Sequence, residues 1–364
     1  MQITSDFESG NAVVLSLTET EANLAIRPDS NAKHYQWFYF QVTGDPSITR
    51  TFRLTNAGDA SYPHAWPGYR ALASYDGLKW FRVNTHYYDG VLTIKHRASE
   101  HKTRYAFFVP YTTAMREQIL TDCETAGERK RILTTSGGRP VDMMVFGNPS
   151  ANKKLWIIAR QHAGEPMAEY CIDGLMRRLL DQNDTVAQAL LSQATIFCVP
   201  NVNPDGSALG NLRTNAAGID LNRDWKQNVA PNSDEVRALK DLMERIGVDF
   251  FIDLHGDEDR HYLWLVQPHP KLVTEAMKTR QQYIEDEVRS RYVEYGPIQP
   301  DDPSTPADTG MAADWVAWRF QCPSVIVELP FKDTFGPQGE PDSLLAAGCA
   351  QFGRDLLEIV QNTL

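Results

Sequence analysis

The sequence pattern changes near residue 113, and this change limits the possible folds more than any other feature. Before it, short runs of aromatic and β-branched residues are separated by turn sequences such as "TGDP" and "SYDG". The runs predicted to be strands cover residues 12–17, 36–42, 51–56, 79–88, 91–96 and 104–109. Strands without an intervening long helix indicate an all-β antiparallel sandwich domain over residues 1–113.

After residue 113, strand patterns alternate with helical patterns. Near-continuous apolar runs predict buried strands at 142–147, 155–160, 194–199, 249–254 and 324–329. Helices are predicted at 114–123, 166–180, 234–246 and 343–360. This alternation is typical of an α/β domain with a mixed, largely parallel sheet between helices. We therefore predict a second domain over residues 114–364, in which the Pro/Asp-rich stretch 296–310 is a loop.

Composition excludes several classes of function. The net charge of −11 argues against non-specific binding of nucleic acid, which requires a basic surface. No run approaches the ~18 apolar residues that cross a membrane, and the first residues lack the apolar core of a signal peptide. The five cysteines are widely spaced and form no C-x-x-C pair, so neither a disulfide framework nor a thiolate zinc site is expected. We expect a cytoplasmic protein that does not associate with membranes.

Four predicted strands of the second domain lead into polar residues. His162 and Glu165 directly follow one of these strands. Another is followed by a Gly- and Asn-rich sequence over residues 200–225 that carries Arg213 and Arg223. The last two carry His255 and Glu328 at or near their ends. The carboxyl ends of parallel strands form the ligand-binding edge of an α/β sheet. These residues are therefore predicted to meet in one site.

Two imidazoles and one carboxylate match the ligand set of a catalytic zinc ion. Taken alone, the spacing of His162 and Glu165 is more often a solvated helix face, and an isolated histidine such as His255 is more often a core residue. A buried Glu328 suits either an ion pair or a general base. Arginines in the Asn-rich segment suit binding of a carboxylate or an oxyanion, but also pairing with Asp205, Asp220 or Asp224.

The order of the motifs H-A-G-E, N-P-D-G, L-R, G-I-D-L-N-R-D-W, L-H-G and V-E-L resembles that of the M14 zinc metallocarboxypeptidases. This resemblance covers residues 114–364. In addition, "FESGN" (7–11) and "HYQWFYFQV" (34–42) are similar to the β-sandwich domain of the cytosolic carboxypeptidases, a subfamily of deglutamylases. The implied architecture is a carboxypeptidase-like α/β domain preceded by a sandwich.

By this resemblance, His162, Glu165 and His255 would bind one zinc ion per chain and leave a fourth position for the attacking water. Asp220 would orient the imidazole of His162.

The resemblance also implies which residues act on the substrate. Glu328 would be the general base that activates the water and then passes a proton to the leaving amine. Arg213 would stabilise the oxyanion. Asn222 and Arg223 would hold the terminal carboxylate of the substrate, which restricts cleavage to a chain end.

The chain departs from the family at positions that are not proposed ligands. The cytosolic subfamily commonly has H-P-G-E and H-G-H where this chain has "HAGE" and "HGDE". Digestive members carry a mobile tyrosine over the substrate, and the matching position here is Pro306. Ala313, expected near the side-chain pocket, is neither acidic nor basic. A glutamate side chain in that pocket would need a cation, and Arg260, Arg319 and Lys332 are the candidates.

We therefore predict a zinc-dependent exopeptidase that hydrolyses the C-terminal peptide bond of peptides or protein tails and releases glutamate or another acidic residue. The alternative is an M14-like amidohydrolase that acts on N-acyl amino acids or γ-glutamyl cell-wall peptides. The sandwich domain favours the exopeptidase, because deacylases with the same zinc triad usually lack it. A non-catalytic binding module is disfavoured because no ligand or base is missing.

Overall fold

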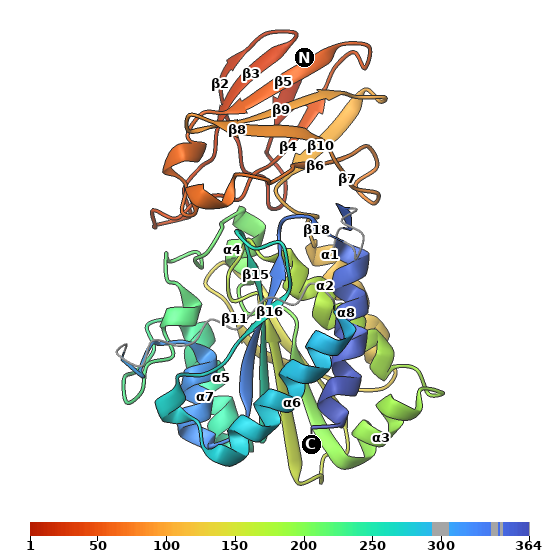
Figure 1. The fold of residues 1–364 in the computed structure, drawn as a ribbon, viewed down its shortest axis with the longest axis vertical. Coiled ribbons are helices and arrows are strands. Elements are labelled where there is room, and N and C mark those ends of the chain that lie inside the picture. The colour runs from red at the N-terminus through yellow and green to blue at the C-terminus, as the bar shows by residue number, and fades with distance from the viewer. Residues whose placement is uncertain (293–305, 336–340, 343–344, 364) are drawn as a thin grey trace.

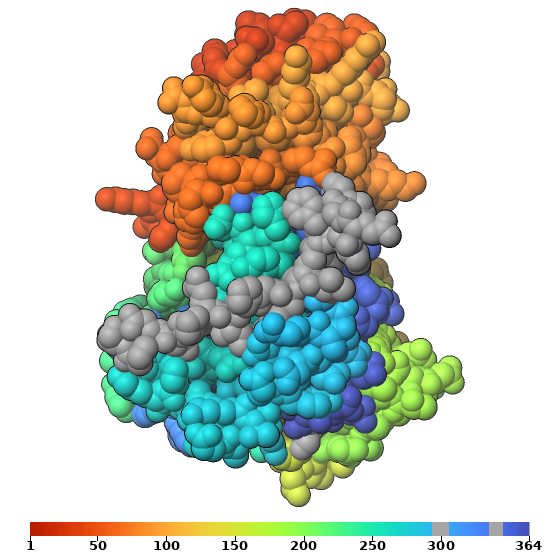
Figure 2. Space-filling model, viewed as in Figure 1, coloured from red at the N-terminus to blue at the C-terminus, as the bar shows by residue number. Residues whose placement is uncertain are grey.

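The computed structural model of the chain describes residues 1–292, 306–335, 341–342 and 345–363. Its N-terminal part consists of β-sheets, and its C-terminal part is a mixed sheet between helices. The two parts lie end to end in the ribbon (Figure 1). In the space-filling view, the red and orange surface of the N-terminal part rests on one end of the C-terminal part (Figure 2).

Two five-stranded sheets build the N-terminal part. One has the order β1 (Gln2–Thr4), β4 (Tyr39–Thr43), β10 (Lys102–Ala106), β6 (Leu72–Ser74), β7 (Phe81–Arg82). The other has the order β2 (Val13–Leu17), β3 (Glu21–Ala25), β5 (Thr49–Leu54), β9 (Val91–Arg97), β8 (Asn84–Tyr88). Between them, Tyr105 packs on Phe40 and Phe52 at ring distances of 5.3 Å and 4.9 Å. Neighbouring strands are antiparallel except β3 and β5, which confirms the predicted class of fold.

The prediction of a single strand over residues 79–88 is wrong. The chain forms β7 in one sheet, passes through the buried Val83 and forms β8 in the other sheet. Apolar and polar residues continue to alternate through this crossing, so the sequence does not mark the change of sheet. Strands β1, β3 and β6 were not predicted, because they have only three to five residues and include polar or small ones.

The C-terminal part contains a seven-stranded sheet. Its order is β11 (Glu128–Thr134), β12 (Pro140–Gly147), β14 (Ala194–Val199), β13 (Lys153–Ala159), β15 (Phe250–Asp257), β17 (Ser324–Pro330), β16 (Trp264–Val266). The four strands β14, β13, β15 and β17 are parallel, and the outer strands are antiparallel to their neighbours. The predicted mixed, largely parallel sheet is therefore confirmed. Thr334–Phe335 (β18) and Pro341–Asp342 (β19) form a separate two-stranded pair.

Helices cover both faces of this sheet, which explains why its central strands are apolar on both sides. Leu155 and Ile157 of β13 join a core cluster with α2 and α8, whereas Trp156 and Ile158 join a second cluster with α5 and α7. The helices are α1 (Thr113–Cys123), α2 (Pro166–Leu179), α3 (Thr185–Gln193), α4 (Pro204–Leu209), α5 (Asp234–Ile246), α6 (Glu275–Arg291), α7 (Ala312–Phe320) and α8 (Ala346–Gln361).

Helix α6 was not predicted, because most of its residues are polar and its apolar face is narrow. The predicted helix at 343–360 is observed from Ala346 onward; residues 343–344, like residues 296–305 of the predicted loop, lie outside the described residues. The division of the chain into domains 1–113 and 114–364 stays a prediction.

Helices α2 and α8 pack closely because each has a glycine at the contact. A Cβ atom on Gly174 of α2 would lie 1.9 Å from the carbonyl oxygen of Ala350. A Cβ atom on Gly353 of α8 would lie 1.8 Å from the carbonyl oxygen of Cys171. Because α2 begins at Pro166, directly after Glu165, this packing also fixes the loop that carries two of the predicted zinc ligands.

Gly353→Ala is expected to destabilise the fold by about 1–3 kcal/mol or more, because the new methyl group would force the two helices apart. Alanine's better helix propensity, worth ~1 kcal/mol, opposes this effect but is smaller. Denaturant-induced unfolding of wild type and variant measures the difference. Gln351→Ala on the exposed face of α8 is the control and should change stability by no more than about 0.5 kcal/mol. Equal stability of the Gly353→Ala variant and wild type would contradict the close contact.

Candidate active site

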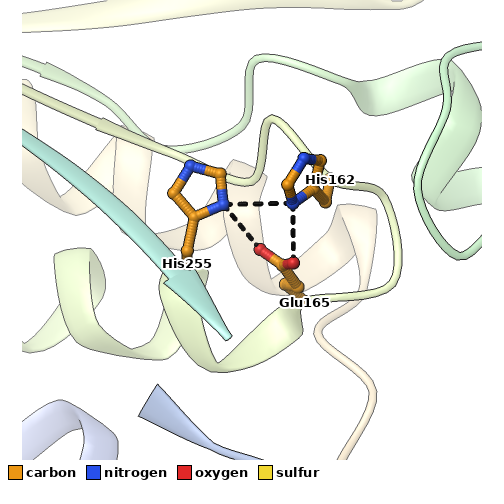
Figure 3. Close-up of side chains that lie close together, drawn as sticks. All are labelled: His162, Glu165 and His255. Carbon is orange, nitrogen blue, oxygen red and sulfur yellow. Dashed lines mark hydrogen bonds and ion pairs between the residues drawn. The ribbon is translucent and has the colours of Figure 1, made fainter. Parts of the chain in front are cut away.

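The three residues predicted to bind zinc lie together at the carboxyl ends of β13 and β15 (Figure 3). His162 Nδ1 is 2.7 Å from Glu165 Oε1, and His255 Nδ1 is 2.9 Å from Glu165 Oε2. The two Nδ1 atoms are 3.2 Å apart. All three side chains are buried. The fold therefore brings His162 and Glu165, which are close in the sequence, together with the distant His255.

This donor set fits a zinc ion. One donor atom from each residue lies within 4.8 Å of the others. Three protein ligands are the number that a catalytic zinc ion takes when its fourth position holds water. Burial raises the pKa of Glu165, but the two imidazoles outweigh it and lower that pKa to about 2. The carboxylate is therefore ionised, as a zinc ligand must be.

Each imidazole turns its other nitrogen toward a carboxylate. His162 Nε2 is 3.3 Å from Asp220 Oδ1, as the predicted orienting role of Asp220 requires. His255 Nε2 is 2.9 Å from Asp253 Oδ2, a contact that was not predicted. Asp253 is fully buried and also accepts a hydrogen bond of 2.6 Å from Gln161 Nε2. The sequence did contain a signal for this contact. Asp253 and His255 are two residues apart in "DLH", and residues two apart on a strand share one face.

A cavity of about 290 Å³ opens beside these residues. Its lining includes all the predicted substrate-binding and catalytic residues and several others, namely Tyr62, His162, Glu165, Arg213, Asn222, Arg223, Gly256, Asp257, Glu258, Trp264, Val266, Met311, Ile326 and Glu328. Tyr62 was not predicted, since it comes from the N-terminal part and no motif marks it. Ala313 is buried in the core and does not line the cavity, whereas the neighbouring Met311 does.

Glu328 lies on β17, directly beside His255 in the register of the sheet. Burial raises the pKa of its carboxyl group well above the ordinary value, and Glu165 adds to this while His255 opposes it. A general base is most effective when its pKa lies nearer the working pH than that of an ordinary carboxyl group, and the raised pKa moves Glu328 in that direction. The alternative of a buried ion pair finds no arginine or lysine partner for Glu328 among the described residues.

Arg213 has two partners at the edge of the cavity. Its Nε donates to Asp220 Oδ2 at 2.6 Å, and its Nη1 donates to the Tyr62 hydroxyl at 2.6 Å. The pairing with Asp220 is one of the structural alternatives left open by the sequence. It does not remove Arg213 from the cavity, so both interpretations apply to the same side chain.

Asn222 and Arg223 lie on the short 3₁₀ turn Leu221–Arg223. Asn222 Oδ1 accepts a hydrogen bond of 2.9 Å from the Ala312 backbone, and its Nδ2 is 3.2 Å from His255 Nε2. Arg223 is exposed, and its Nη1 donates only to the Asn222 carbonyl oxygen among the described residues. The guanidinium thus keeps donors for a carboxylate in the cavity.

The three candidate cations for a glutamate side chain lie in different places. Arg260 stacks over the ring of Trp264 at 3.8 Å and lies 3.5 Å from Asp257, and both neighbours line the cavity. Arg319 instead pairs with Glu244 on the outer surface, and Lys332 is buried beside Asp259. Only Arg260 of the three contacts the cavity wall. Pro306 is exposed, and no described tyrosine other than Tyr62 lines the cavity.

Comparison with known proteins decides the family. Residues 112–345 match the family model described as zinc carboxypeptidase, and residues 3–108 match the cytosolic carboxypeptidase N-terminal domain. The chain belongs to the zinc carboxypeptidase family. As a member it is a metallocarboxypeptidase, a hydrolase with a catalytic zinc ion that acts on peptides. The described residues contain no helix with the length and apolar character needed to cross a membrane.

Three relatives illustrate the likeness. A metallo-carboxypeptidase from Pseudomonas aeruginosa, solved with (2-guanidinoethylmercapto)succinic acid, is 36% identical with a TM-score of 0.92, over 100% of this chain and 98% of that one. An uncharacterised protein of Zymomonas mobilis is 34% identical over 99% of this chain and 96% of its own length. Bovine cytosolic carboxypeptidase 3 is 27% identical over 71% of this chain, which spans only 30% of that protein.

Asp253→Asn is expected to weaken zinc binding about 10- to 100-fold, because a neutral amide orients and polarises the His255 imidazole less well than a carboxylate does. Competition with a fluorescent zinc chelator measures the affinity. Asp249→Asn is the matched control: it precedes the same strand, and its carboxylate accepts from the Lys154 backbone, far from the metal. Unchanged zinc affinity in the Asp253→Asn variant would rule out this role.

Proposed function

We propose that this zinc carboxypeptidase removes a C-terminal glutamate, or another acidic residue, from peptides or protein tails. The observation that carries the proposal is the single cavity in which the zinc-binding group, a carboxyl group with a raised pKa and two arginines face one another. The roles of the individual residues are part of the proposal.

The chain supplies the groups that peptide hydrolysis needs. When bound by His162, Glu165 and His255, zinc lowers the pKa of water and polarises the scissile carbonyl. Glu328 takes the proton from the attacking water and passes it to the leaving amine. Its place beside His255 in the sheet keeps it next to the metal-binding group.

Each of the two arginines binds a different negative charge, one the terminal carboxylate of the substrate and the other the charge on the carbonyl oxygen. Arg223, exposed in the cavity, binds the terminal carboxylate together with Asn222. Arg213, held by Asp220 and Tyr62, stabilises the charge that develops on the carbonyl oxygen. A clamp on the terminal carboxylate explains why such an enzyme would cleave at a chain end only.

Arg260 is the cation best placed to bind an acidic side chain. It stacks on Trp264, while Val266 and Ile326 offer apolar contacts for methylene groups in the same cavity. The P. aeruginosa relative was solved with a derivative of succinic acid, which carries two carboxylates, as a C-terminal glutamate does. That compound also carries a guanidino group, so a basic side chain must be tested as well. The name of the cytosolic carboxypeptidases supports the expected cytoplasmic location.

The direct test is release of free amino acid from peptides that differ only in a C-terminal Glu, Ala or Lys. We expect release from the Glu peptide to be fastest, to stop with a zinc chelator and to return with added zinc. Acyl-amino acids and γ-glutamyl muropeptides in parallel reactions test the amidohydrolase alternative. Faster turnover of either, or of the Lys peptide, would contradict the proposed substrate.

Arg260→Met serves as the matched variant in this assay, since it keeps a long side chain on Trp264 but removes the charge. It should lower kcat/KM for the Glu peptide by roughly tenfold or more, the worth of one charge-assisted hydrogen bond of ~1.5–3 kcal/mol. The Ala peptide should be cleaved as before. An equal loss of kcat/KM with both peptides would mean that Arg260 does not bind the C-terminal side chain of the substrate.

Glu328→Gln is expected to lower kcat by at least about 10²- to 10⁴-fold, the usual contribution of a general base, because the amide cannot take up a proton. Zinc content should remain one ion per chain, measured by atomic emission on the purified variant. Glu244→Gln, a change on the exposed surface of α5, is the control. Substantial activity of the Glu328→Gln variant would assign the base to another group.

A further inference from the structure

Tyr62 comes from the N-terminal part of the chain, yet its side chain lines the cavity beside the predicted zinc ligands. It precedes the 3₁₀ turn Pro63–Ala65, between strands β5 and β6. Its hydroxyl oxygen accepts a hydrogen bond of 2.6 Å from Arg213 Nη1. Burial and the nearby Glu258 raise the pKa of this hydroxyl, so it is protonated at neutral pH.

The backbone of Tyr62 is held firmly from its own side. Its N–H donates to Gln36 Oε1 at 2.8 Å, and its carbonyl oxygen accepts from Gln36 Nε2 at 3.3 Å. Gln36 is fully buried, and it lies among the aromatic residues that lead into β4. A paired amide of this kind fixes the position of the phenol ring relative to the sandwich core.

Arg213 is in turn fixed by its hydrogen bonds to Asp220 and Tyr62. Its Nε is occupied by Asp220 and its Nη1 by Tyr62, whereas Nη2 contacts no acceptor among the described residues. A guanidinium group is planar, so two fixed corners determine the direction of the third. Tyr62 thereby sets where the free end of Arg213 points in the cavity.

The N-terminal part also holds the backbone that carries Arg213. The carboxylate of Asp29 accepts hydrogen bonds from the backbone N–H groups of Leu212, Arg213 and Thr214, at 2.5, 2.8 and 2.9 Å. Asp29 is buried. Both the backbone and the guanidinium of Arg213 are thus positioned by residues that lie more than 140 positions earlier in the chain.

We propose that Tyr62 is a positioning residue of the active site, which acts by aligning Arg213 with the carbonyl oxygen of the substrate. This proposal rests on the oxyanion-stabilising role proposed for Arg213. It gives the N-terminal part a share in catalysis through Arg213, since a C-terminal part alone would lack one of the two groups that orient the guanidinium.

A purely structural role, in which Tyr62 only ties the two parts together, accounts less well for these contacts. Other bonds already join the parts: Arg82 Nε pairs with Asp333 at 2.7 Å and Arg82 Nη2 donates to the Phe331 carbonyl oxygen at 2.7 Å. The four hydrogen bonds of Asp29 add to them. The Tyr62 hydroxyl contributes one bond more, and it lies in the cavity.

The experiment uses the full-length zinc enzyme and the variant Tyr62→Phe, which keeps the ring and removes the hydroxyl. We expect kcat to fall about 10- to 100-fold with little change in KM, a part of the ~10²–10³-fold that loss of an oxyanion donor costs. Zinc content and the midpoint of thermal unfolding should stay close to wild type. Tyr35→Phe is the matched control, because it removes a hydroxyl that bonds to the Asn56 carbonyl oxygen within the sandwich.

A double-mutant cycle with Arg213→Ala separates positioning from other effects. If Tyr62 acts through Arg213, Tyr62→Phe should cause no further loss of kcat in the Arg213→Ala background. Arg213→Lys replaces Arg213→Ala if the latter does not fold. Additive losses, or a kcat of Tyr62→Phe equal to that of wild type, would overturn the proposal.

The cycle is measured on whichever C-terminal residue the wild-type enzyme releases fastest. A preference for a residue other than glutamate would thus contradict the proposed substrate and still leave the cycle decisive for Tyr62.

Discussion

Parallel pairing of β13, β15 and β17 is the constraint on which the rest of the site depends. Parallel strands end at the same edge of a sheet, so the residues that follow β13 and those at the ends of β15 and β17 must meet there. In this chain they are His162 and Glu165, His255, and Glu328. The helices on both faces bury the strands and keep these ends in fixed register, and the glycine contact between α2 and α8 fixes the loop after β13.

Charge balance explains why so many ionisable groups are stable in a buried position. Glu165 lies between two imidazoles, and each imidazole faces a second carboxylate on its other side, Asp220 or Asp253. A zinc ion with two positive charges would balance this surplus of negative charge. Glu328 differs from Glu165, since burial raises the pKa of its carboxyl group well above the ordinary value, as it also does for Glu258 in the same cavity. Its place directly beside His255 in the sheet is what marks Glu328 as the group that would move protons.

The sequence predicted much of the fold because the elements concerned have simple local patterns. Strand β14 and helix α5 were predicted with the bounds that the structure has, since a near-continuous apolar run and a helical pattern that begins with acidic residues are strong signals. The crossing at Val83 and the polar helix α6 were missed. In both cases tertiary packing decides the structure: β7 and β8 belong to different sheets despite continuous alternation, and α6 buries only a narrow face.

The sequence by itself determined the chemical kinds of group in the site and their order along the chain, which sufficed to identify the family. It also indicated which of them follow strands, because hydrophobic runs are local. Only the tertiary structure showed that Asp253 faces His255, that Arg260 alone of three candidate cations reaches the cavity wall, and that Tyr62 and Asp29 orient Arg213 from the N-terminal part. These contacts join residues that no local pattern relates, and the packing of the two parts creates them.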